Sequence, residues 1–331
     1  MNRTIQSLLI SIFFLVMMVL LFRDHVMPSL TRGRGVEVDR RVLADSWSNQ
    51  NDWMEIRIGD QRLGAMHSTA EENDSKTGFV MTTNLRVDGG LIRGRLISSS
   101  RLNKRLELEA IRLRVQLAGF AGRVMSAEEL DSEELPRGAF ELVGIVEGTT
   151  ARFRVKRDDS QQFFEQHLAR PVTLSDSITP VLRGQMLNQN VDYAIDVYDP
   201  FLGNSASSVI VTYLRDEMEN VGGELQTVKK VQIRYQSSRI FLAVDGNGNI
   251  LRREIPLLAP GTAGAKADDA AKVPTLVLER VASGDARSRW PDLAYTPRPA
   301  AIAPEDVRGE NKGQLLQGFS LTSLLSQGAK K

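Results

Sequence analysis

WMEIRIGDQRLGAMHST, from Trp53 to Thr69, decides the fold class. From Trp53 to Ile58, side chains alternate at period two, so successive residues point to opposite faces of an extended strand. Gly59-Asp60-Gln61-Arg62 is turn chemistry, and Leu63 to Thr69 returns with a second alternating run. The stretch therefore predicts a β-hairpin with a tight polar loop.

The same pattern recurs along the chain. Phe79–Val87 and Leu91–Ser98 flank Asp88-Gly89-Gly90, whose glycines can adopt the positive φ that short hairpin turns need. Further predicted strands are Phe140–Glu147, Ala151–Lys156, Tyr193–Tyr198, Val209–Leu214, Leu225–Tyr235, Ile240–Val244 and Ile250–Ile255. A total of about ten strands predicts a mainly β fold, with a curled antiparallel sheet or an open half-barrel.

The strand pattern is less regular in two segments. Apolar residues fall on even numbers from Leu106 to Ala110 and on odd numbers from Ile111 to Leu117, which predicts a β-bulge near Ala110. A helix over Leu102–Leu117 is the alternative, because Arg, Leu and Glu favour helices. Phe163, Phe164 and Leu168 are spaced as on a short amphipathic helix, which we predict there.

The N-terminus carries a different signal. Ile5–Phe22 reads IQSLLISIFFLVMMVLLF and has no charge, and about 18 apolar residues suffice to cross a bilayer as a helix. A cleaved signal peptide is the competing interpretation, but no small-residue cleavage site follows Phe22. We therefore expect residues 1–23 to be a cytoplasmic start and a transmembrane signal anchor, with the lipid bilayer as partner of Ile5–Phe22.

Composition shifts predict the remaining boundaries. Residues 24–51 are expected to be a tether, 52–258 a β-rich domain with a possible sub-boundary near 172–184, and 259–331 a flexible tail rich in Pro, Ala and Gly. An amphipathic segment at 314–327 could dock on a partner, on the chain's own sheet, or have no role. Its apolar residues are Leu315, Leu316, Phe319, Leu321, Leu324 and Leu325.

Composition also limits the chemistry. The 331 residues include 42 Lys+Arg against 41 Asp+Glu, so no strong positive field attracts nucleic acid, and none is expected as a partner. The absence of Cys excludes thiolate metal sites and a cysteine nucleophile, and only His25, His67 and His167 could supply imidazole. Asp245–Asn249 resembles the start of a calcium loop but lacks the later residues, so a plain turn is expected. We predict no catalytic residues, no metal and no cofactor.

One resemblance adds to these observations. Trp53–Gly64 is similar to the opening hairpin of β-rich bacterial envelope domains that often precede transglutaminase-like domains. Ile178 through Asp199-Pro200, and Phe241 to Glu254, are similar to the second half of those domains. The resemblance covers Trp53 to Pro256 and implies an extracytoplasmic curled sheet, like the half-barrel of periplasmic lipoprotein carriers. No transglutaminase module follows Ile255, so catalysis is not implied.

The orientation in the membrane is open on sequence grounds. Arginines that follow the span, from Arg23 to Arg41, would place the domain in the cytoplasm by the positive-inside rule. The resemblance implies the opposite side, and we favour an inner-membrane, single-pass protein with a periplasmic or other extracytoplasmic domain.

The expected function is non-enzymatic binding or scaffolding in the cell envelope, with envelope proteins or a lipid as possible partners. The first alternative is a lipid or lipoprotein carrier that uses the concave face of a half-barrel. The second is an accessory factor of a transglutaminase-like or other envelope enzyme system. Residues predicted to face a ligand are Trp53, Ile56, Ile58, Phe79, Leu113, Val115, Ile195 and Phe241.

Overall fold

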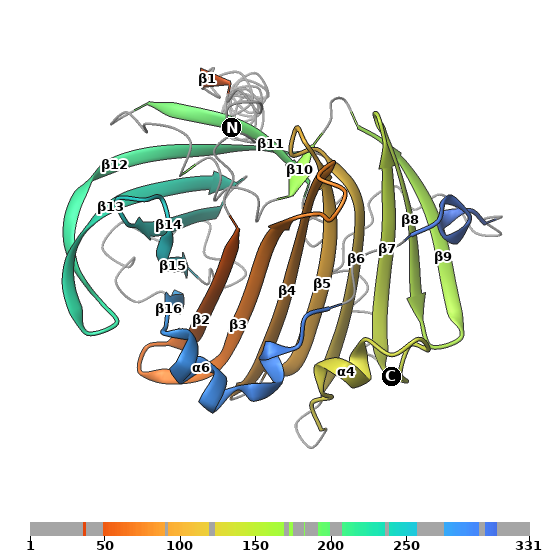
Figure 1. Ribbon diagram of the computed structural model, residues 1–331, viewed down its shortest axis with the longest axis horizontal. Helices are drawn as coiled ribbons and strands as arrows, with labels where there is room; N and C mark the ends of the chain where they lie inside the picture. Colours follow the sequence, from red (N-terminus) through yellow and green to blue (C-terminus); the bar gives the residue numbers. More distant parts are fainter. Residues whose placement is uncertain are drawn as a thin grey trace, which may run out of the picture.

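The protein is mainly β, and a single sheet organises it. The computed structural model describes residues 36–37, 49–89, 92–118, 123–168, 172–174, 182, 191–198, 207–235, 238–256, 275–297 and 302–309. The sheet has sixteen strands, of which fourteen form one antiparallel series (Figure 1). The strands follow the order β1-β11-β12-β13-β14-β15-β16-β2-β3-β4-β5-β6-β7-β8-β9, and β10 pairs with β11.

One half of the sheet is an eight-strand meander in which each strand pairs with the next along the chain. Its strands are β2 (Gln50–Ile58), β3 (Gln61–Glu72), β4 (Gly78–Gly89), β5 (Ile92–Asn103), β6 (Leu108–Ala118), β7 (Ala139–Glu147), β8 (Thr150–Arg157) and β9 (Ser160–His167). The hairpins predicted at Gly59-Asp60 and around Gly89 are both confirmed.

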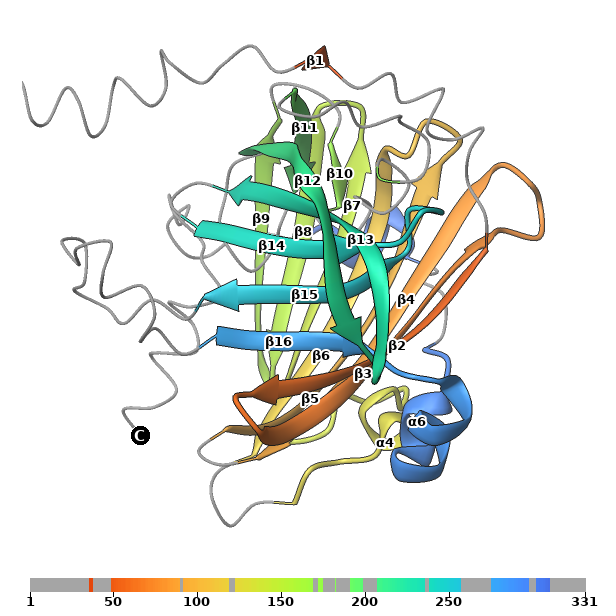
Figure 2. The ribbon, with the colours of Figure 1, turned by 90° about the vertical axis from the view of Figure 1, so that its left-hand side faces the viewer.

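The other half crosses over the first. It contains β11 (Asp192–Tyr198), β12 (Ser207–Val221), β13 (Glu224–Tyr235), β14 (Ser238–Val244), β15 (Ile250–Pro256) and β16 (Thr275–Arg280). Two short parallel strands, β1 (Val36–Glu37) and β10 (Thr173–Leu174), pair with β11. Figure 2 shows β14–β16 running across β6–β9, so the sheet curls. No pairing between described residues joins β9 to β11, so the sheet is not closed into a barrel.

The structure corrects the predicted tail at residues 259–331. Thr275–Arg280 forms β16, which lies between β15 and β2 and joins the two halves of the sheet. Leu278 alternates with Val277 and is buried in the main core, which gives the segment a reason to stay in the sheet. The β-rich domain therefore extends well past residue 258.

The predicted bulge near Ala110 is confirmed. Arg101 pairs with Ala110 and Leu102 pairs with Leu108, so Glu109 is the extra residue of β6. The bulge keeps both Leu108 and Ile111 in the core although they differ in parity. The alternative of a helix over Leu102–Leu117 is excluded, because β5 and β6 occupy that stretch.

The predicted short helix around Phe163, Phe164 and Leu168 is wrong. Ser160–His167 is strand β9, paired with β8 over its whole length. Phe164 lies opposite Phe153, and their rings stack with centroids 4.9 Å apart. This cross-strand contact and the backbone ladder outweigh the helical spacing of the apolar residues.

The two faces of the sheet differ in what covers them. We call the face that carries Met54 and Ile56 the inner face; it holds the main core, where residues of both halves such as Leu113, Val211 and Leu242 pack together. The opposite, outer face is covered by α4 (Ala127–Leu130) and by residues 281–297 and 302–309, which together we call the C-terminal strap. The strap contains α6 (Ser283–Arg289), η4 (Pro291–Ala294) and η5 (Pro304–Val307). Within the strap, α6 contacts β2, and η4 contacts β3 and β4; Figure 1 shows α6 at this end of the strands.

The strap is held by buried polar side chains of the outer face as well as by Leu293, which is 0% exposed. Asn84 Nδ2 donates to the carbonyls of Asp292, Leu293 and Tyr295, at 3.3–3.4 Å. Arg95, fully buried, pairs with the Asp292 carboxylate, and His67 Nδ1 lies 2.9 Å from the Leu293 carbonyl oxygen. Burial lowers the pKa of His67 below its ordinary value.

Several predictions fall outside the described residues. These include the span Ile5–Phe22, nearly all of the 24–51 tether, most of 172–184, and the 314–327 segment with its leucines. Within the part of the chain that the structure describes, none of the helices has the length and apolar character needed to traverse a bilayer.

Candidate functional site

A row of polar side chains crosses the inner face where the neighbouring residues are apolar. Asp52 of β2 pairs with Ser68 of β3, Ser68 with Thr83 of β4, and Thr83 with Ser98 of β5. Residues directly opposite each other in antiparallel strands project from the same face of the sheet. The four side chains therefore form one continuous row, which ends at Leu113 of β6.

Methionines flank this polar row. Met54 lies opposite Met66 on one side of it, and on the other side Gln50 lies opposite Ala70, which in turn lies opposite Met81. Thioether side chains are flexible and polarizable, so they adapt to the shape of a bound group. The inner face thus changes from a packed apolar core to a mixed polar surface at this end of β2–β4.

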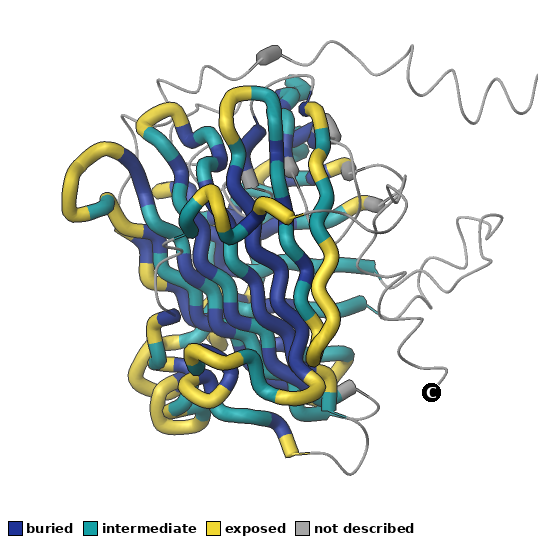
Figure 3. Tube along the Cα trace, turned by 90° about the vertical axis from the view of Figure 1, so that its right-hand side faces the viewer, coloured by how far each residue is buried: buried dark blue, intermediate teal, exposed yellow. Residues whose placement is uncertain are grey.

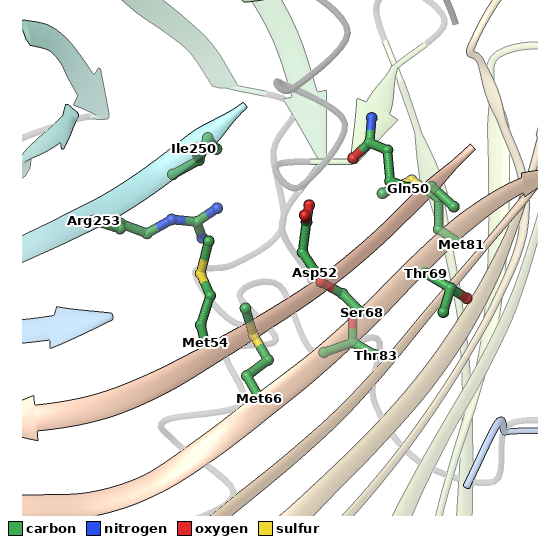
Figure 4. Close-up of a pocket in the computed structure, with 11 residues that line it drawn as sticks. Gln50, Asp52, Met54, Met66, Ser68, Thr69, Met81, Thr83, Ile250 and Arg253 are labelled. Carbon is green, nitrogen blue, oxygen red and sulfur yellow. The ribbon is translucent and has the colours of Figure 1, made fainter. Parts of the chain in front are cut away.

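A cavity of about 40 Å³ opens over the row. Strands β2, β3 and β4 form its floor, and β15 contributes Ile250 and Arg253 from the other half of the sheet (Figure 4). Its lining residues are Gln50, Asp52, Met54, Met66, Ser68, Thr69, Ala70, Met81, Thr83, Ile250 and Arg253. The cavity exists because the sheet curls and brings β15 over β2, although these two strands are far apart in the sequence.

The cavity presents more hydrogen-bond donors than charged acceptors. Asp52 supplies the one carboxylate among the described residues of the lining, and Arg280 Nη2 lies 2.8 Å from Asp52 Oδ1. Gln50 is 9% exposed, and its amide nitrogen has no hydrogen-bond partner among the described residues. Arg253 and the hydroxyls of Ser68 and Thr83 can also donate. A small anionic or carbonyl group would satisfy this donor set.

None of the eight residues predicted to face a ligand lines this cavity. Five of them belong to the main core on the inner face: Ile56, Phe79, Leu113, Val115 and Ile195. Ile58 is half-buried at the end of β2. The structure therefore brings most of these residues together, but as core packing beside the cavity.

Trp53 and Phe241 were predicted on the wrong face. Trp53 packs on the outer face with Leu293 and Ala286 of the strap and stacks on His67, with centroids 4.1 Å apart. Phe241 alternates with Leu242, a residue of the main core, so its side chain projects from the outer face. For Trp53, the error arises because the strap makes this part of the outer face apolar enough to hold an aromatic residue.

The residues that line the cavity were missed, although the sequence carries a signal for them. Gln50 and Asp52 share their parity with Met54 and Ile56, so they had to lie on the same face as the core. Polar residues at core parity near a strand end indicate a place where the core gives way to a cavity. Arg253 carried no such signal, since its position depends on the curl of the sheet.

The loop that resembles a calcium site is a turn, as predicted. Asp245 Oδ1 accepts hydrogen bonds from the backbone N–H groups of Asn247 and Asn249, each at 2.8 Å. This side chain therefore closes the β14–β15 hairpin.

Comparison with known proteins adds a similarity to a solved structure. No family model matches the sequence, and no curated protein matches it. The chain is similar to the crystal structure of a β-barrel-like protein of domain of unknown function DUF1849 from Brucella abortus, with a TM-score of 0.43 and 7% sequence identity. The match covers 70% of this chain and 95% of that one.

Proposed function

We propose that this chain is a non-enzymatic, membrane-anchored protein of the cell envelope whose curled sheet binds a molecule through the inner-face cavity. The observation that carries the proposal is the buried amide of Gln50, which lacks a partner beside Asp52 and the hydroxyls of Ser68 and Thr83. A buried donor without a partner costs free energy, and a bound acceptor would recover it. The proposed anchor is Ile5–Phe22.

The size of the cavity favours recognition of a small group rather than enclosure of a whole lipid. Pockets that enclose drug-sized ligands measure roughly 300–1,000 Å³, whereas this cavity measures about 40 Å³. A carboxylate or phosphate at the end of a larger molecule would fit, while the rest of that molecule stays outside. The carrier function would instead need a long apolar cavity for an acyl chain.

Removal of the guanidinium of Arg253 should abolish binding. We expect native mass spectrometry of the full chain, released from detergent, to show an added mass that disappears in Arg253→Gln, because charge-assisted hydrogen bonds to an anion are lost. Arg239→Gln is the matched control: Arg239 is an exposed arginine on the adjacent strand β14 and should leave the added mass in place.

Two results would overturn this proposal. One is a bare mass for the wild-type chain, and the other is an added mass that persists in Arg253→Gln. Extraction and fragmentation of the bound molecule then identify its end group, and an entirely uncharged lipid would favour the carrier function.

A further inference from the structure

Strand β9 lies at an edge of the sheet and has an open side. It pairs with β8 from Arg157–Ser160 to Thr150–His167 without a register shift. No other described strand pairs with it. An edge strand of this kind presents backbone N–H and C=O groups along its open side, ready to pair with another strand. Figure 3 views the side of the molecule on which β7–β9 lie.

The opposite edge of the sheet is covered. On the side of β11 away from β12, β1 pairs with Tyr193 and Ala194, and β10 pairs with Val197 and Tyr198. These two short strands occupy most of the seven-residue edge of β11. The described structure gives β9 no comparable cover.

β9 also lacks the features that protect edge strands. Its sequence, SQQFFEQH, contains no Lys, Arg or Pro, and Glu165 is its one carboxylate. Inward charges, prolines and bulges are the usual ways in which proteins prevent edge-to-edge pairing. Five of its eight residues are exposed. Gly309 of the strap lies against the Phe163 ring, but no described strand pairs along the open edge of β9.

We propose that β9 pairs antiparallel with β9 of a second copy of this chain, about a two-fold axis, so that two sheets join into one. This inference does not depend on the proposed function, because β9 lies away from the cavity. The argument for a second copy is that the strand is complementary to itself. With the axis at Phe163, Gln161 lies opposite Glu165 of the partner; with the axis at Phe164, Gln162 lies opposite Gln166.

Both registers keep matching faces together and place no two like charges opposite each other. With the axis at Phe163, Ser160 also lies opposite Gln166 and Gln162 opposite Phe164; with the axis at Phe164, Gln161 lies opposite His167 and Phe163 opposite Glu165. In each register one phenylalanine meets its own copy on the axis. A two-fold interface requires this self-complementarity, because each contact between two residues occurs twice.

Cysteine crosslinking tests the pairing cleanly, since the chain has no cysteine of its own. Single cysteines are placed in turn at positions 161 to 166 of the full chain in detergent and are oxidised mildly. Only the residue on the axis meets its own copy, so the crosslinked fraction should peak at 163 or 164 and fall on both sides. Leu225→Cys, at an exposed site on the β12–β13 hairpin, sets the background.

A second measurement covers the case in which a cysteine at Phe163 or Phe164 disturbs packing. Light scattering, corrected for detergent, should give twice the mass of one chain for the wild type and for Asn220→Lys/Leu225→Lys. Gln162→Lys/Gln166→Lys should give the mass of one chain, because lysines on the edge block pairing. A wild-type mass of one chain, or crosslinking along β9 that stays at the Leu225→Cys level, would overturn the proposal.

Discussion

A chain that ends at Pro260 is expected to lose its cooperative fold. The truncation removes β16, which lies between β15 and β2, and leaves both of those strands with an unpaired edge. It also removes Leu278 from the main core and the strap residues Leu293 and Val307 from the outer face. Deleting one buried leucine side chain costs about 2–5 kcal/mol, and an entire domain is stable by only about 5–15 kcal/mol. The combined loss exceeds what the fold can tolerate.

A chain that ends at Gly309 is the matched control, because it keeps β16 and the strap. Limited proteolysis and circular dichroism compare the two truncations with the full chain. We expect residues 49–256 to be degraded in the chain that ends at Pro260 and to resist in the chain that ends at Gly309. Equal resistance of the two truncations would show that β16 is dispensable, contrary to its place in the sheet.

Asp292→Ala is expected to destabilise the protein by about 3 kcal/mol, the lower end of the range for breaking a buried ion pair. Arg95 is fully buried, and its guanidinium would lose the carboxylate that neutralises it. Arg86 Nη1, 2.8 Å from Asp292 Oδ2, would lose a partner as well. We use the lower end because Asp292 itself is 25% exposed, and water can replace part of the interaction.

The control for this change is Asp285→Ala, which removes an exposed acidic residue from the first turn of α6. Chemical unfolding followed by tryptophan fluorescence reports on both variants, since Trp53 and Trp290 lie in the cluster that the strap covers. Asp285→Ala should unfold close to the wild type. If Asp292→Ala also unfolded close to the wild type, the buried guanidinium of Arg95 would not need its ion pair with Asp292 of the strap.

Local pattern predicted the hairpins of this fold well. The alternation in Trp53–Thr69 and the turn glycines near Asp88 act within a few residues, and so does the parity change that marks the bulge in β6. Each of these features is determined by neighbours along the chain. The curled antiparallel sheet followed from the number of such strands.

Features that depend on distant contacts were predicted poorly. β16 is six residues long and follows a stretch rich in Ala and Gly, so nothing local indicated that it pairs with β2, over two hundred positions earlier. β9 shows helical spacing of apolar residues, and only its pairing with β8 makes it a strand. In the candidate site, the parity of Gln50 and Asp52 was readable, whereas the approach of Arg253 required the curl of the sheet.

The most direct test of the cavity as a binding site is a methionine oxidation footprint of the full chain. Met66 and Met81 line the cavity, whereas Met218 is exposed on the β12–β13 hairpin and serves as an internal control. With the bound molecule in place, peroxide should oxidise Met66 and Met81 more slowly in the wild type than in Arg253→Gln, while Met218 reacts equally in both. Equal oxidation of Met66 and Met81 in the two proteins would contradict binding in the inner-face cavity.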